Sequence, residues 1–180
     1  YLEQAGFPEE AAREYRAALE QEPEEPGRYI DLAEALIAAG KPQEAVEVLD
    51  QADDTLGETS EIAYARGLAL AVQGEIQDAE EAFERATELD PRSAGAWRKL
   101  GRARLRLDDA RGAVSAYGEA VSLAPLPPAD RVDLGNAYRQ LGDARRARKQ
   151  FEEAAAQNSD PDAAAKAREA LESMSREAQP

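Results

Sequence analysis

The sequence repeats with a period of 34 residues, and this period constrains the fold more than any other feature of the chain. One column of the repeat is always alanine, and the position four residues later is always large and apolar. A second alanine follows three residues further on in every copy. In chain order the columns read Ala11, Tyr15, Ala18; Ala45, Leu49, Ala52; Ala79, Phe83, Ala86; Ala113, Tyr117, Ala120; and Ala147, Phe151, Ala154. Agreement across five copies indicates tandem copies of one structural unit.

The first half of each repeat has columns of its own. A small residue is preceded by a longer one in Leu32-Ala33, Arg66-Gly67, Leu100-Gly101 and Leu134-Gly135. Further apolar positions lie three or four residues away, which is the spacing of one helix face. A turn residue then interrupts the pattern at Gly40, Gly74, Asp108 and Gly142. Each repeat is therefore predicted to be two short antiparallel helices, which touch at the small columns.

These columns resemble tetratricopeptide repeats (TPR) of the bacterial type. Trp97, Leu100 and Gly101 with Ala113 and Tyr117 match the family pattern within one repeat, although Arg104 replaces its aromatic residue. The resemblance covers residues 1–161, with repeats at 1–25 (partial), 26–59, 60–93, 94–127 and 128–161. It implies an all-α fold, a right-handed α-solenoid of helix-turn-helix repeats.

The two ends of the repeat array differ. Asp160 followed by Pro161 is typical of a helix start, so residues 162–180 are predicted to form a C-terminal capping helix and tail. Ala164, Ala167, Leu171 and Met174 form one narrow apolar stripe along it, as expected of a helix that covers a last repeat. At the front, Tyr1 and Leu2 are expected to belong to a helix that began earlier, which favours a piece of a longer protein.

The composition excludes most catalytic chemistry. The chain has no histidine and no cysteine, so the commonest general base and the thiolate metal ligands are absent. Asp50, Asp53 and Asp54 lack the central glycine and final glutamate of a calcium loop. We therefore expect no catalytic residues, no cofactor, no metal and no enzymatic activity. No apolar stretch reaches the ~20 residues needed for membrane insertion, and the absence of cysteine fits cytoplasm or periplasm equally.

Charge is distributed unevenly along the repeats. The chain carries a net charge of −15, which argues against a nucleic-acid partner. Residues 1–93 have seven basic and 24 acidic residues, a net charge of −17, whereas residues 94–180 have 15 and 13, a net charge of +2. One predicted helix concentrates positive charge in Arg98, Lys99, Arg102, Arg104 and Arg106. The two halves are thus predicted to present different fields to a partner.

The family resemblance implies that the first helix of each repeat lines a concave peptide-binding groove. The candidate partner-binding residues in those columns are Tyr64, Leu68, Arg98, Lys99, Arg102, Arg106, Asn136 and Arg139. An apolar shelf beside arginines suits a peptide with an apolar side chain next to an acidic residue or a C-terminal carboxylate. The alternative is that these arginines pair with carboxylates of the neighbouring acidic repeat, which would stabilise the stack only slightly. Asp133 stands where the chaperone-binding subset has an amide, which argues against chaperone tails as ligands.

The sequence predicts a non-catalytic protein–protein interaction scaffold or adaptor that binds a peptide or helix of a partner. Two alternatives stay open. The array could be a regulatory or docking domain of a larger enzyme, or a head-to-tail self-assembly module in which the acidic front of one copy meets residues 94–127 of another.

Overall fold

The computed structural model describes residues 7–157 and 159–177, and these residues form ten α-helices and no strand. The chain divides into two compact units, Tyr1–Pro91 and Arg92–Pro180, called unit 1 and unit 2 below. The prediction of an all-α chain of helix pairs is confirmed. The predicted helix at Tyr1 and Leu2 lies outside the described residues.

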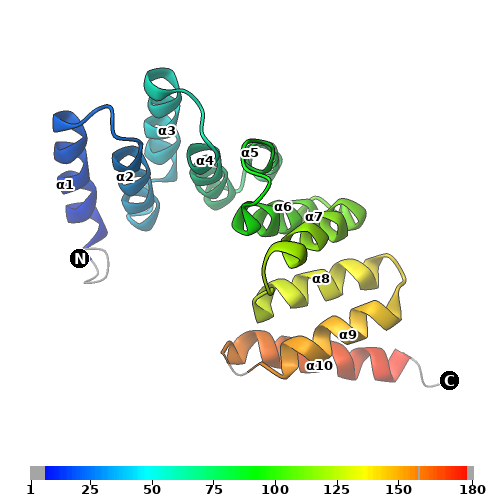
Figure 1. Cartoon of the computed structure of the whole chain (residues 1–180). Coiled ribbons are helices and arrows are strands. Elements are labelled where there is room, and N and C mark those ends of the chain that lie inside the picture. The colour runs from blue at the N-terminus through cyan, green and yellow to red at the C-terminus, as the bar shows by residue number, and fades with distance from the viewer. Residues whose placement is uncertain (1–6, 158, 178–180) are drawn as a thin grey trace. The chain divides into compact units, whose positions relative to one another are not determined.

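Unit 1 contains five helices that contact one another in chain order (Figure 1). They are α1 (Pro8–Gln21), α2 (Pro26–Ala38), α3 (Pro42–Leu56), α4 (Ser60–Gln73) and α5 (Ile76–Leu89). In addition α2 contacts α4, so the first helices of two successive repeats form one layer.

Unit 2 is built in the same way. Its helices are α6 (Ala94–Arg106), α7 (Ala110–Leu123), α8 (Pro128–Gln140), α9 (Ala144–Ala155) and α10 (Pro161–Glu177). Consecutive helices are in contact, and α8 also contacts both α6 and α10. The layer formed by α6, α8 and α10 is the face on which a groove of this unit would lie.

The tight turns inside the repeats depend on left-handed backbone. Gly40, Gly74 and Gly142 have φ angles of 73°, 89° and 76°. Asp108, which takes the same place in its repeat, has a φ of 60° and is the only non-glycine residue with positive φ in the described chain. Aspartate tolerates this conformation better than most side chains do. Asp108 can therefore form the same turn that glycine forms in the other repeats.

The two helices of a repeat approach closely where a glycine faces an aromatic ring. A Cβ added at Gly67 would lie 2.5 Å from the Phe83 ring, and one added at Gly135 would lie 2.6 Å from the Phe151 ring. The small column is therefore a packing requirement, as the sequence predicted.

Helix α10 begins as predicted. The Asp160 Oδ1 atom accepts a hydrogen bond from the Ala163 backbone N–H at 2.9 Å, which satisfies one of the free donors at the helix start. Ala167 and Met174 are buried in one core cluster with the last repeat, and half-buried Leu171 packs against it, while Ala164 is also buried. The α10 helix covers α8 and α9.

Candidate functional site

The eight predicted partner-binding residues fall in both units. Tyr64 and Leu68 lie on α4 of unit 1. The other six lie in unit 2: Arg98, Lys99, Arg102 and Arg106 on α6, and Asn136 and Arg139 on α8. Helices α6 and α8 are in contact, so unit 2 by itself gathers most of the predicted site.

The apolar part of the predicted site lies on α4. The Tyr64 ring packs against the Phe83 ring with centroids 5.9 Å apart and planes tilted by 56°. Tyr64 and Leu68 are half-buried, and Val72, one helical turn beyond Leu68, is 58% exposed. This side of α4 offers accessible apolar surface.

The basic part of the predicted site holds an ion-pair cluster, formed by Arg98 and Arg102 of α6 with Asp130 and Asp133 of α8. Arg98 Nε donates to Asp130 Oδ2, and Arg102 Nη2 donates to Asp130 Oδ1 at 2.7 Å. Arg102 Nε donates to Asp133 Oδ2 at 2.9 Å. Both arginines thus pair within the chain, but with carboxylates of the following repeat and not with those of the preceding acidic repeat. The pairs join the first helices of two successive repeats.

Burial makes this cluster structurally important. The Asp130 side chain is only 3% exposed, and its two oxygens are held by two guanidinium groups. Burial raises the pKa of Asp133, although Arg102 opposes that shift. Burial lowers the pKa of Arg102, but Asp133 and Asp130 outweigh it, so that pKa is raised overall. Tyr117 of α7 donates its hydroxyl to Asp133 at 3.3 Å, which ties the second helix of the repeat to the cluster.

The remaining cations of the predicted site are not used in this way. Within the described part of the chain, Lys99, Arg106 and Arg139 make no ion pair or side-chain hydrogen bond. Lys99 is half-buried, and burial together with Arg102 and Arg98 lowers its pKa. Arg106 and Arg139 are exposed in the last turns of α6 and α8, where positive charge complements the helix dipole.

A surface hollow of ≈ 400 Å³ adjoins the ion-pair cluster. Three helices of this layer contribute to it. The lining residues are Arg102 of α6, Ala129, Val132 and Asp133 of α8, and Asp162, Ala163 and Lys166 of α10, with Asp160 before α10. Asp133 is already bound by Arg102, and Asp160 caps α10. The side chains of Lys166 and Asp162 make no ion pair or hydrogen bond with the rest of the described chain, so they are the charges of the hollow that a ligand would meet first.

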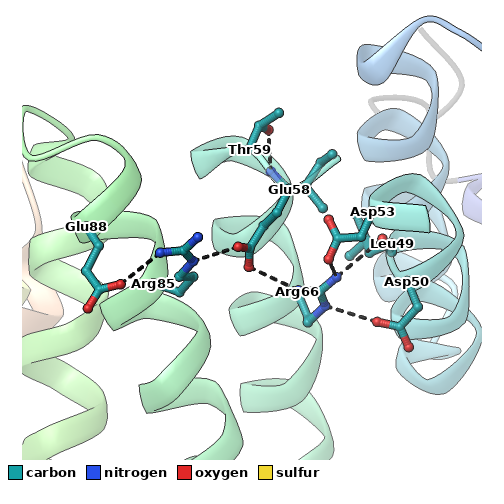
Figure 2. Close-up of polar contacts among 9 residues, drawn as sticks. Leu49, Asp50, Asp53, Glu58, Thr59, Arg66, Arg85 and Glu88 are labelled. Atoms are coloured by element: carbon teal, nitrogen blue, oxygen red, sulfur yellow. Dashed lines mark hydrogen bonds and ion pairs between the residues drawn. The ribbon is translucent and has the colours of Figure 1, made fainter. Parts of the chain in front are cut away.

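A second polar cluster, in unit 1, was not singled out from the sequence. Figure 2 shows Arg66 of α4 reaching α3, where its Nε atom lies 3.1 Å from Asp50 Oδ1 and its Nη2 atom contacts Asp53 Oδ2. Glu58 then pairs with Arg85 of α5 at 2.6 Å. The available signal was Arg66 itself, because the same column holds leucine in three other repeats. An arginine in an apolar column requires carboxylates nearby.

The described residues contain no group of three acidic, histidine or cysteine side chains placed to hold a metal ion. None of the described helices combines the length and the apolar character that crossing a bilayer requires.

The fold and these paired helices define a helical-repeat interaction protein. Two models described as tetratricopeptide repeat match the sequence, one over residues 2–69 and the other over residues 64–128 and 132–173. The chain therefore belongs to the tetratricopeptide repeat family, whose members are generally non-catalytic scaffolds for protein–protein interaction. A comparison with curated protein sequences gave no match.

Solved structures share the fold. The crystal structure of MamA is 27% identical, with a TM-score of 0.74 over 85% of this chain and 90% of that one. TTC0263, a thermophilic TPR protein in Thermus thermophilus, is 20% identical, with a TM-score of 0.73 over 94% and 93%. YrrB, a TPR protein with an unusual peptide-binding site, is 19% identical, with a TM-score of 0.73 over 93% and 87%. The last two likenesses concern the fold alone.

Proposed function

We propose that the chain is a non-catalytic scaffold or adaptor that binds an extended peptide of a partner protein on the layer of first helices. The observation that carries this proposal is the hollow in unit 2, to which α6, α8 and α10 all contribute side chains. Such a hollow offers a concave surface to a ligand, and two of its charged side chains, Asp162 and Lys166, have no described partner. Membership of an interaction family and the peptide-binding neighbour YrrB support the proposal.

The preferred ligand is a peptide with an acidic side chain or a C-terminal carboxylate. Lys166 offers an unpaired ammonium group, and Arg102 Nη1 offers donors beyond the two atoms that hold Asp130 and Asp133. Lys99, Asn136, Arg106 and Arg139 extend the same layer and would contact neighbouring parts of the peptide. In unit 1, taken by itself, Tyr64 and Leu68 of α4 would receive an apolar side chain of a ligand.

The test uses a displayed library of random peptides, selected on the full chain. Enriched peptides should contain aspartate or glutamate, and their affinity, measured by fluorescence polarisation, should fall for Lys166→Glu. Lys149→Glu is the matched control, because it reverses an exposed lysine charge on α9, outside the hollow. Failure to enrich any peptide, or equal affinity for Lys166→Glu and the unaltered chain, would overturn the proposal. Charge reversal of Arg98 or Arg102 is unsuitable here, since it would break the buried pairs with Asp130.

A further inference from the structure

The two units differ in how many of their basic side chains are paired with carboxylates of the same unit. Unit 1 has six basic and 24 acidic residues, a net charge of −18. All six basic residues are ion-paired within the unit, through Arg13–Glu10, Arg16–Glu44, Arg28–Glu22, Lys41–Glu44, Arg66–Asp53 and Arg85–Glu58. Unit 2 has 16 basic and 13 acidic residues, a net charge of +3.

Unpaired arginines in unit 2 gather at its two tight turns. Arg106 ends α6 and Arg111 begins α7, while Arg139 and Arg145 flank the turn between α8 and α9. Figure 1 shows both turns on the same side of the unit. All four side chains are exposed, and none has a hydrogen bond or ion pair from its side chain to any residue that the structure describes. We call these four residues the arginine edge.

The carboxylates at the same turns offset only part of the positive charge of this edge. Asp109 Oδ1 accepts the Gly112 backbone N–H at 2.9 Å, and Asp143 Oδ1 accepts the Arg146 N–H at 3.0 Å. Both aspartates are therefore engaged as helix caps, and Asp143 also pairs with Arg146. Asp108 is the third carboxylate at these turns, so cations outnumber carboxylates there.

Two positions on the edge oppose the stability of their own helices. Arg111 and Arg145 are each the second residue of a helix, where the helix dipole disfavours positive charge. Neither α7 nor α9 has an acidic residue in its first turn, whereas α1, α3 and α5 of unit 1 do. Unpaired arginines at unfavourable positions contribute little to folding, which points to a role in an intermolecular contact.

We propose that the arginine edge of one copy binds the acidic surface of unit 1 of a second copy, head to tail. Unit 1 carries the complementary negative charge, and every copy of the chain contains both this acidic surface and the arginine edge. Its exposed carboxylates without a described partner include Glu14, Glu20, Glu47, Asp54, Asp78 and Glu81. The guanidinium fork of arginine binds carboxylates through two parallel hydrogen bonds.

This geometry makes the assembly open and sensitive to salt. The arginine edge and the acidic surface are two different surfaces, so an open oligomer always has an unoccupied arginine edge at one end and an unoccupied acidic surface at the other. Such a head-to-tail contact forms an open chain unless the rotation between successive copies closes a ring. Because the contact is between exposed charges, it weakens as the Debye length falls from about 10 Å at 0.1 M salt to about 3 Å at 1 M. Arg106 and Arg139 also belong to the proposed peptide-binding layer, so the test below changes Arg111 and Arg145, which do not.

The test is sedimentation velocity of the full chain across protein concentrations at about 0.1 M and about 1 M NaCl. Oligomers that grow with concentration are expected at low salt and monomers at high salt. Arg111→Glu/Arg145→Glu should weaken association about tenfold or more. It should not unfold the chain, because glutamate is favoured in the first turn of a helix. Lys166→Glu/Arg168→Glu on α10 is the matched control, with the same change in net charge, and should assemble like the unaltered chain.

An experiment that mixes the edge variant with the unaltered chain distinguishes the head-to-tail contact from other modes of association. The edge variant keeps its acidic unit 1, so labelled variant should join the unaltered chain and shorten its oligomers. A monomeric unaltered chain at low salt, or an edge variant that assembles normally or never joins the mixture, would overturn the proposal. If the monomer instead bound poly-glutamate or duplex DNA through Arg111 and Arg145, the edge would belong to another acidic partner, and the proposal would again fail.

Discussion

Gly135 of α8 lies directly against the Phe151 ring of α9, so closely that an added Cβ would stand 2.6 Å from the ring. The pairs Gly67–Phe83 and Gly101–Tyr117 repeat this relationship in the two preceding repeats. In the repeat at 26–59 the same columns hold Ala33 and Leu49, both fully buried. A larger residue on the first helix is therefore matched by a smaller one on the second.

This matching predicts that Gly135→Ala destabilises unit 2 by about 1–2 kcal/mol. Overpacking costs about 1–3 kcal/mol, and the helix preference of alanine over glycine returns up to about 1 kcal/mol. Urea unfolding followed by the fluorescence of Trp97, the only tryptophan in the chain, would measure the change. Gly118→Ala is the control, because no atom lies within 4 Å of its added Cβ, and it should be stabilising.

Adding Phe151→Leu to Gly135→Ala recreates the pair found at Ala33 and Leu49. The double variant should lose less stability than the two single changes combined, with a coupling of about 0.5 kcal/mol or more. Strict additivity would show that the glycine column is not set by the ring opposite it.

Asp130 should be essential to unit 2 because it is buried between two arginines. We expect Asp130→Asn to lower the free energy of unfolding by about 1.5–3 kcal/mol, the range for hydrogen bonds to charged groups. The loss stays below that of a fully buried pair because the Arg98 and Arg102 side chains are 34% and 41% exposed and can rehydrate. Asp162→Asn removes an unpaired carboxylate from α10 and should change stability by no more than about 0.5 kcal/mol. Equal unfolding midpoints for the two variants would contradict this account.

The sequence predicted the fold far better than it predicted the site. Helix pairing, turns and the start of α10 followed from local columns, since each repeats the same contact every 34 residues. The pairing of Arg98 and Arg102 with Asp130 and Asp133 involves residues about one repeat apart, and no column records it, because the other repeats fill these positions differently. Asp130 in particular reads as a first-turn acid of α8, while in the fold it is buried.

Arg66 and Arg85 each pair with acidic side chains in unit 1, and they should differ in importance. The Arg66 side chain is 18% exposed and bridges α3 and α4, whereas the Arg85 side chain is 46% exposed. Arg66→Met should cost about 1.5–3 kcal/mol, because it leaves half-buried Asp53 without its partner. Arg85→Met should cost about 0.2–1 kcal/mol, as exposed pairs do. Hydrogen exchange over α3 and α4 measures both changes in unit 1, and equal acceleration by the two variants would argue against the bridge.

Tyr117 should make the free energy of unfolding of unit 2 decrease at alkaline pH. Burial, followed by the nearby charge of Asp133, raises the pKa of its hydroxyl in the folded chain. The folded state then keeps a proton that the unfolded state loses above about pH 10. The stability that the hydroxyl contributes is complete below pH 10 and falls by about 1.4 kcal/mol per pH unit above it, until the raised pKa is reached. Tyr117→Phe should therefore be less stable than the unaltered chain at pH 8, because it loses the hydrogen bond to Asp133, and should equal or exceed it by pH 11. Urea unfolding at both pH values compares the two proteins directly, and Lys99, which also titrates in alkali, is common to both. A difference that stays constant from pH 8 to pH 11 would show that Tyr117 ionises as freely in the folded chain as in the unfolded one.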